Sequence, residues 1–217
     1  MKHLLAAIRF ITIWPAGTSN HFDSAGMGAW FRVVGLLLWA DLAVFDQGVG
    51  RLWGPQAAAA MDVVFLAAAT GAFHLDGLAD AADGLFSHRS REKALEIMKD
   101  SRIGAMGVVA LCAVLALKWA GIGGLDGHRS LLLVLVPAYA RGGILCAMRW
   151  LEYGRPGGGT GRPFFTRRIG WRQLWALGLT MALSAGLGPT ALAMNAGFVL
   201  LAALLIAFFK RRLGCVT

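Results

Sequence analysis

Long apolar stretches separated by polar segments dominate this chain and predict about six membrane-spanning helices. The stretches cover residues 27–46, 57–75, 104–121, 130–150, 173–187 and 189–209. Most approach the roughly 20 apolar residues that a helix needs to cross a bilayer, and the fifth is short. The N-terminal segment, which Arg9 interrupts and which precedes Pro15, predicts an interfacial helix rather than a signal peptide. The pattern therefore predicts an all-α polytopic membrane bundle that forms one domain over residues 1–217.

The composition agrees with a membrane protein and excludes several other classes. Hydrophobic residues make up 57% of the 217 residues, charged residues only 15%, and the mean hydropathy is +0.61. A soluble domain carries about 25% charged residues. The net charge of +9 then indicates topology rather than nucleic-acid binding. Cys112, Cys146 and Cys215 have no paired spacing, which argues against a disulfide framework or a zinc site.

The distribution of basic residues predicts an orientation in the bilayer. If the segment after the second span faces the cytoplasm, 16 of the 21 Lys and Arg residues lie on that side. Basic residues favour the cytoplasmic side, so we expect both termini there and an integral protein of the bacterial cytoplasmic (inner) membrane. Two cytoplasmic segments are then long enough to hold a site. These are residues 74–104 and a Gly- and Arg-rich loop at 151–172.

Three aspartates at the end of the second span are the strongest chemical signal. Asp76, Asp80 and Asp83 are spaced i, i+4 and i+7, so a helix places them on one face. Three carboxylates so close repel one another unless a cation lies between them, and Mg²⁺ is a hard cation that takes such ligands. Gly77 and Gly84 each follow an aspartate and allow another backbone or a ligand to approach closely.

A cationic segment follows, after a predicted helix with Ser90 as its N-cap. Lys99 and Arg102 predict a clamp for phosphate, and Asp100 between them is either a further metal ligand or a partner of Arg102. His74 is either a ligand or a hydrogen-bonding residue near the membrane surface. Two further arginines are candidates for binding an anionic substrate: Arg141 within a span, where a charge is costly, and Arg155 in the Gly-rich loop.

These motifs resemble those of the cobalamin synthase family, the adenosylcobinamide-GDP ribazoletransferases. The resemblance is carried by His74 to Gly84 and by Leu95 to Gly104, with weaker similarity at 10–15, 31–37 and 153–159. The chain stops at Thr217, short of the family's usual C-terminal pattern, so either a terminal helix is missing or this member does without it.

The resemblance implies a reaction and a role for each site residue. A hydroxyl of α-ribazole, or of its 5′-phosphate, attacks adenosylcobinamide-GDP and releases GMP. Mg²⁺ is expected on Asp76, Asp80 and Asp83, with Asp83 alternatively accepting the hydroxyl proton. Lys99 and Arg102 are expected to hold the diphosphate. His74, Asp100, Arg141 and Arg155 complete the expected substrate contacts.

Two other functions compete with this interpretation. CDP-alcohol phosphatidyltransferases have a comparable aspartate motif, but here Ala79-Asp80 stands where that family has Ala-Arg, and no distal run of aspartates follows. A cation transporter would use the acidic face as an ion site, although the chain has no internal repeat of the kind that transporters often contain. The sequence is compatible with an oligomer and leaves its state open.

Overall fold

The computed structural model describes residues 2–17, 24–125, 127–155, 157–159, 161–165 and 169–216. Within these residues the chain forms two compact units, Met1–Leu133 and Val134–Thr217, and each is described by itself. The expectation of one domain over residues 1–217 remains a prediction.

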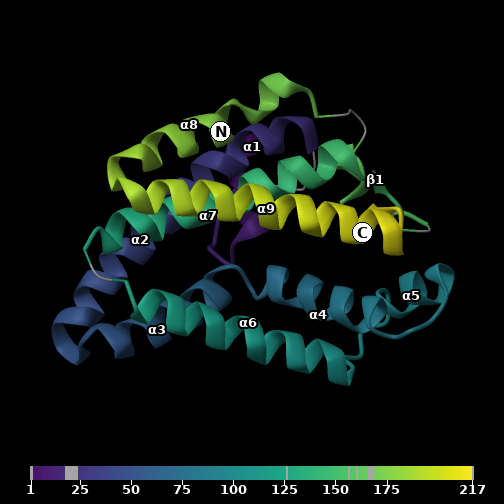
Figure 1. Ribbon diagram of the computed structural model, residues 1–217, viewed down its shortest axis with the longest axis horizontal. Coiled ribbons are helices and arrows are strands. Elements are labelled where there is room, and N and C mark those ends of the chain that lie inside the picture. Colours follow the sequence, from purple (N-terminus) through teal and green to yellow (C-terminus); the bar gives the residue numbers. More distant parts are fainter. Residues whose placement is uncertain are drawn as a thin grey trace. The chain divides into compact units, whose positions relative to one another are not determined.

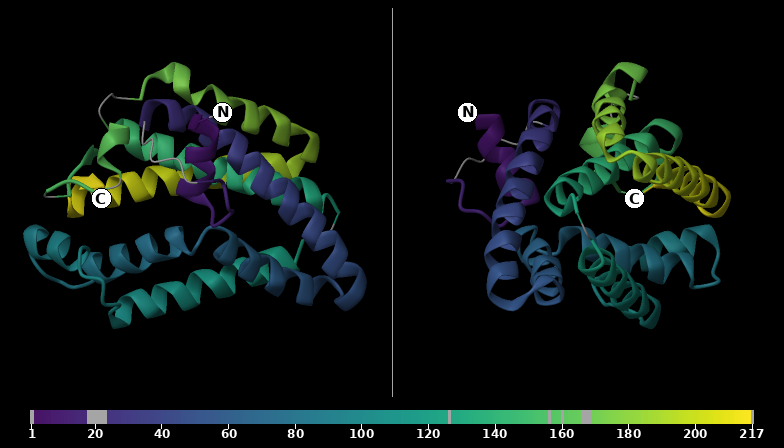
Figure 2. Two further views of the ribbon diagram at one scale, coloured as in Figure 1. Left: turned by 180° about the vertical axis from the view of Figure 1, so that it is seen from behind. Right: turned by 60° about the vertical axis from the view of Figure 1, so that its left-hand side comes forward.

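The first unit is made entirely of helices (Figure 1). Helix α2 packs against α1 and α3, and α6 packs against both α3 and α4. Seen from behind, α4 and α6 run side by side, with the short α5 next to α4 (Figure 2). The helices are α1 (Lys2–Ile11), α2 (Ser24–Trp53), α3 (Pro55–Ala69), α4 (Phe73–Leu85), α5 (Arg91–Ile97) and α6 (Ala105–Gly123).

The second unit contains most of α7 (Arg129–Trp150), followed by shorter elements and one long helix. The Tyr139 hydroxyl donates to Asn195 Oδ1 at 2.7 Å and lies 2.9 Å from Ser184 Oγ, which joins α7, α8 and α9. Strands β1 and β2 pair in parallel, with Glu152 opposite Cys215. The remaining elements are β1 (Glu152–Tyr153), η1 (Arg162–Phe165), η2 (Trp171–Leu174), α8 (Trp175–Ser184), η3 (Ala185–Leu187), α9 (Pro189–Arg212) and β2 (Cys215–Val216).

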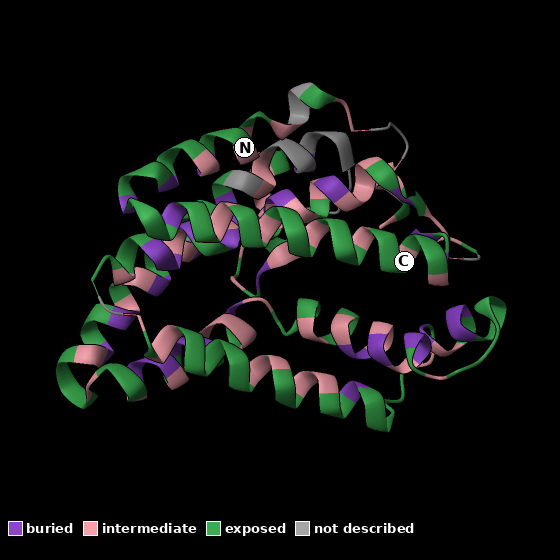
Figure 3. Ribbon diagram, in the orientation of Figure 1, coloured by how far each residue is buried: buried purple, intermediate pink, exposed green. Residues whose placement is uncertain are grey.

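The helical content confirms the predicted all-α membrane fold. Among the described residues, four helices are long and apolar enough to span a bilayer, or five if α3 and α4 together form one span. The predicted span 173–187 gives a shorter apolar helix, Trp175–Leu187. Exposed positions run along α6 and α9 (Figure 3), and these positions are largely apolar, as a lipid-facing surface requires.

The second predicted span, 57–75, differs most from the structure. Helix α3 ends at Ala69, and α4 leaves at 89° to it. Gly71 and Ala72 both adopt left-handed backbone conformations, with φ of +57° and +56°, and this turn is what breaks the span. The aspartate motif therefore lies on a separate helix, and it is not a continuation of a straight span.

Candidate active site

The turn between α3 and α4 positions the first two aspartates. Ala72, a non-glycine residue in the left-handed region, is the N-cap of α4, so the helix starts abruptly at Phe73. Ile13 N donates to Ala69 O at 2.9 Å and ties the N-terminal segment to the end of α3. A positive φ at a residue with a side chain costs energy and is common near functional sites. The turn places Asp76 in the first turn of α4 and Asp80 in the next.

Asp76 and Asp80 line one cavity of about 270 Å³ in the first unit. Asp76 is exposed and Asp80 is half-buried. Ser101, from the loop before α6, lines the same cavity, so three of the lining residues have oxygen-bearing side chains. The rest of the lining is apolar: Ala72, Leu75, Ala79, Ile103 and Leu111. A polar cluster in an apolar wall is typical of a ligand site, although this one is smaller than a drug-sized pocket.

Asp83 has a different environment from the other two aspartates. Its Oδ2 accepts a hydrogen bond from Gly104 N at 2.7 Å, and its Oδ1 accepts one from Gly107 N at 2.8 Å. These are unsatisfied N–H groups at the start of α6, so the carboxylate caps that helix and complements its dipole. Asp83 is not among the residues that line the cavity. Asp83 therefore joins α4 to the start of α6, and its expected roles as metal ligand or base stay predictions.

The glycines around Asp83 explain how it comes so close to α6. A Cβ atom on Gly104 would lie 2.5 Å from Asp83 Oδ1, and one on Gly107 would lie 2.5 Å from Asp83 Oδ2. Gly84 allows a similar approach by Met98, whereas Gly77 has open space around its Cα. The expected close approach is thus confirmed at Gly84 and is not found at Gly77.

The cationic segment before α6 is ordered by its own ion pair. Arg102 donates from Nη2 to Asp100 Oδ2 at 2.6 Å and from Nε to both carboxylate oxygens at 3.0 and 3.1 Å. The Arg102 guanidinium, with help from the Arg102 backbone N–H, lowers the pKa of Asp100 from 3.8 to about 2. Of the two roles expected for Asp100, the structure shows the ion pair with Arg102. Arg102 Nη1 takes no part in this pair.

Local structure next to this segment follows the sequence signals. The Ser90 hydroxyl accepts from Lys93 N at 3.4 Å, which confirms Ser90 as the N-cap of α5. Ala94, Leu95 and Met98 are buried, so α5 turns its apolar face inward. Lys99 follows on the exposed side, next to the segment that carries Asp100 and Ser101.

Among the remaining expected site residues, His74 belongs to the first unit and is not among the residues that line the cavity. His74 is exposed, with its ring 5.6 Å from that of Phe73. Arg141 and Arg155 belong to the second unit, where both are half-buried. Arg141 Nη1 lies 3.4 Å from Pro137 O in its own helix. Their roles in substrate binding therefore stay predictions.

The donor set of the cavity fits a hard cation such as Mg²⁺. Carboxylate and hydroxyl oxygens are the ligands that this ion prefers, and Mg²⁺ is usually held by one or two carboxylates together with substrate phosphates. In the described part of the chain, no three His, Cys, Asp or Glu side chains gather at metal-binding spacing. The arrangement fits a cation held by Asp76, Asp80 and a phosphate, rather than one enclosed by three aspartates.

Sequence reasoning overlooked Ser101 and Gly107. Ser101 lines the cavity and stands in the sequence between Asp100 and Arg102. Its place within this motif could have marked it as a site residue. Gly107 lies three residues beyond the motif. A glycine is required there because the Asp83 carboxylate contacts the start of α6. No pattern within the chain signals that contact.

Comparisons with known proteins agree on one family. A family model described as cobalamin-5-phosphate synthase matches residues 3–217. A protein of Herpetosiphon aurantiacus named adenosylcobinamide-GDP ribazoletransferase is 38% identical over 86% of this chain and 76% of its own length. Proteins of the same name from Desulforamulus reducens and Citrobacter koseri are 35% and 38% identical, over 99% and 94% of this chain and 87% and 83% of their own lengths. No solved structure matches the chain.

Proposed function

Because the chain belongs to the cobalamin-5-phosphate synthase family, we propose that it joins adenosylcobinamide-GDP to α-ribazole, or to α-ribazole 5′-phosphate, in an Mg²⁺-dependent reaction. Membership of this family makes the chain a transferase of cobalamin nucleotide-loop assembly. The family match favours this function over a phosphatidyltransferase or a cation transporter. The substrates, the metal and the site residues are the parts that we propose.

The proposed reaction is a substitution at phosphorus. A ribose hydroxyl oxygen of the ribazole forms a bond to the phosphorus atom next to cobinamide, and the bond from that phosphorus to the bridging oxygen breaks. GMP leaves with the bridging oxygen, and adenosylcobalamin or its 5′-phosphate is the product. The hydroxyl proton passes to a carboxylate of the aspartate motif.

Asp76 and Asp80 are the residues that would hold Mg²⁺, and Ser101 adds a hydroxyl to the same cavity. When bound there, the metal would neutralise charge on the diphosphate and on the departing GMP. The cavity, at about 270 Å³, suits the diphosphate and is too small for a corrinoid.

The cationic segment is suited to the diphosphate. Arg102 is 87% exposed at its side chain, and Asp100 holds one edge of the guanidinium in a fixed orientation. A guanidinium oriented in this way offers its remaining N–H groups to phosphate oxygens, and Lys99 adds a second positive charge. We propose that this segment lies at the cytoplasmic face of the inner membrane, as the distribution of basic residues predicts.

The observation that carries the proposal is the shared cavity of Asp76, Asp80 and Ser101. These residues come from two segments of the family motif, and the fold brings both segments to one place. A test is to incubate the full-length protein in lipid nanodiscs with adenosylcobinamide-GDP and α-ribazole, with Mg²⁺ or with a chelator. We expect the joined product and GMP in equal amounts only when Mg²⁺ is present. Product formation at the same rate in chelator would contradict the proposed metal requirement.

A further inference from the structure

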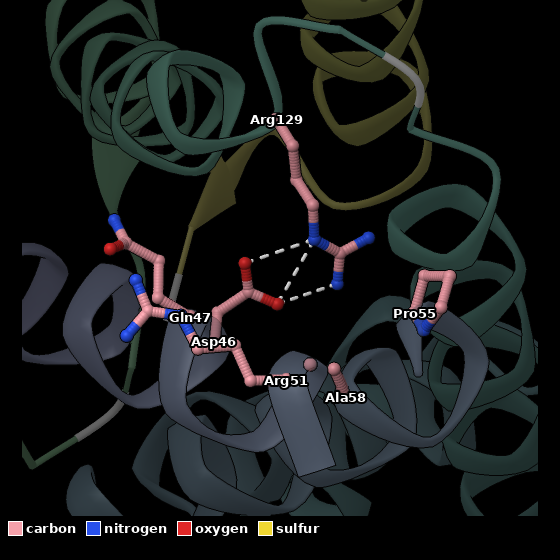
Figure 4. Close-up of a pocket in the computed structure, with 7 residues that line it drawn as sticks. Asp46, Gln47, Arg51, Pro55, Ala58 and Arg129 are labelled. Carbon is pink, nitrogen blue, oxygen red and sulfur yellow. Dashed lines mark hydrogen bonds and ion pairs between the residues drawn. The ribbon is translucent and has the colours of Figure 1, made fainter. Parts of the chain in front are cut away.

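A second group of acidic residues lies in the first unit, away from the motif. Asp46 of α2 and Asp62 of α3 both contact Arg129 at the start of α7. Asp46 is 4% exposed and Asp62 is fully buried. Figure 4 shows the Arg129 side chain reaching across to the Asp46 carboxylate. Buried acids are costly unless a cation or hydrogen bonds compensate each of them.

Arg129 donates hydrogen bonds to both oxygens of the Asp46 carboxylate. Its Nε lies 3.0 Å from both Asp46 oxygens, and its Nη2 donates to Asp46 Oδ1 at 2.7 Å. Arg129 Nη1 donates to the carbonyl oxygen of Ile122, which lies in the C-terminal turn of α6. This bidentate pair accounts for the single positive charge of the guanidinium.

The Asp62 carboxylate receives fewer hydrogen bonds than the Asp46 carboxylate. Its Oδ2 receives only a longer bond of 3.3 Å from the same Nη2 atom that already serves Asp46. Its Oδ1 is buried and has no hydrogen-bond donor among the residues that the structure describes. Asp46 and Arg129 are the charged groups that act on Asp62, and the one charged side chain of α6, Lys118, is exposed. Two buried carboxylates thus share one guanidinium, which leaves one negative charge without compensation.

We propose that the Asp46–Arg129–Asp62 cluster is a binding site for one monovalent cation, a proton or a sodium ion, held at Asp62 Oδ1. One bound positive charge makes the cluster neutral and satisfies the oxygen that the protein leaves unpaired. A cavity of about 290 Å³, lined by Asp46, Gln47, Arg51 and Arg129 among others, borders the Asp46–Arg129 pair, which in turn contacts Asp62. A bulkier ligand would have to break the bidentate pair.

This site is separate from the proposed catalytic metal. Arg129 contacts the C-terminal end of α6 through Ile122, whereas Asp83 contacts the N-terminal end through Gly104. The 19 residues of α6 span about 28 Å, so the two clusters lie at opposite ends of this helix. The two sites can therefore be tested independently.

The test measures thermal unfolding of the full-length protein in nanodiscs. The midpoint is followed in sodium chloride and in choline chloride of equal ionic strength, and in choline chloride from mildly acidic to mildly alkaline pH. A cation that binds only the folded protein stabilises it in proportion to its concentration. We expect the wild-type midpoint to rise with sodium if the ligand is sodium, or to fall as pH rises if it is a proton. In the proton case, the infrared spectrum of the wild type also contains the carbonyl band of a protonated carboxyl group.

Two variants separate the proposal from general effects of salt and pH. Asp62→Asn removes the excess charge with little change in shape, and Asp46→Asn leaves Asp62 as the one carboxylate of this cluster beside Arg129. We expect both to lose the cation dependence of the wild type. Asp41→Asn, at an exposed position of the same α2, should keep it. A wild type that responds to neither cation, or an Asp62→Asn or Asp46→Asn variant that responds as the wild type does, would overturn the site.

Discussion

The first unit holds two pairs of aspartates that have the same chemistry and opposite surroundings. Asp76 and Asp80 lie one turn apart on α4 and line a cavity together with a serine. Asp46 and Asp62 come from different helices and are buried around one arginine. The first pair remains accessible to a metal and a phosphate, and the second pair is held within the protein. Accessibility, more than residue type, separates the proposed substrate site from an internal charge cluster.

The two pairs also differ in how much hydration energy their carboxylates lose when the protein folds. A carboxylate that water can reach, such as that of the exposed Asp76, loses little hydration energy. A buried carboxylate loses its hydration and depends on the guanidinium that replaces it. We therefore expect changes at the buried pair to affect stability first, and changes at the cavity pair to affect turnover first.

The largest expected effect is that of Arg129→Met. This change leaves two buried carboxylates without their guanidinium, and breaking a buried pair in this way costs about 3–5 kcal/mol. Unfolding of the purified protein in detergent by a chemical denaturant measures the loss. Arg51→Met is the matched control, because Arg51 is exposed and lines the same cavity. Equal stability of the two variants would show that the buried pair is not dependent on Arg129.

The next effect tests how α4 is fastened to α6. In Gly104→Ala the new Cβ atom would lie 2.5 Å from Asp83 Oδ1, so Asp83 must move and its hydrogen bonds to α6 are disturbed. We expect a loss of about 1–3 kcal/mol in the same denaturation experiment. Gly121→Ala, on the same helix with open space around it, should be neutral or slightly stabilising. If the two variants behave alike, the Asp83 cap contributes nothing measurable.

The smallest expected effect is that of Asp100→Asn. The pKa of Asp100 is lowered to about 2, so its charge and its support of Arg102 are present above its ordinary pKa of 3.8 and are lost only as the pH falls through about 2. Because the pair is exposed, we expect GMP release to fall only a few-fold. The ratio between wild type and variant should stay constant across neutral and mildly acidic pH. A ratio that changes in that range would contradict the lowered pKa of Asp100.

The cavity pair could be predicted from the sequence, and the buried pair could not. Asp76 and Asp80 stand four residues apart in a motif, and helical periodicity alone puts them on one face. The same periodicity groups Asp83 with them, but it cannot show that Asp83 also accepts hydrogen bonds from the backbone of Gly104 and Gly107. The contacts of Arg129 with Asp62 and Asp46 join residues 67 and 83 positions apart, a separation that no local pattern reveals.

The fold shows the same limit. Apolar runs located the long helices α6, α7 and α9 to within a few residues, because length and hydropathy determine a span. The bend between α3 and α4 lies within an apolar run and depends on two backbone conformations, at Gly71 and Ala72. Hydropathy carries no information on backbone dihedral angles, so the sequence predicted a straight span there.

The most direct test of the proposed site is GMP release by Asp80→Ala in nanodiscs with saturating Mg²⁺. We expect a loss of about 100-fold or more, because the variant lacks one of the two carboxylates proposed to hold the metal. Membrane insertion and the unfolding midpoint should match those of the wild type. Glu96→Gln, an exposed acid on α5 outside the cavity, should keep full activity. Wild-type turnover by Asp80→Ala would contradict the central claim that this cavity is the active site.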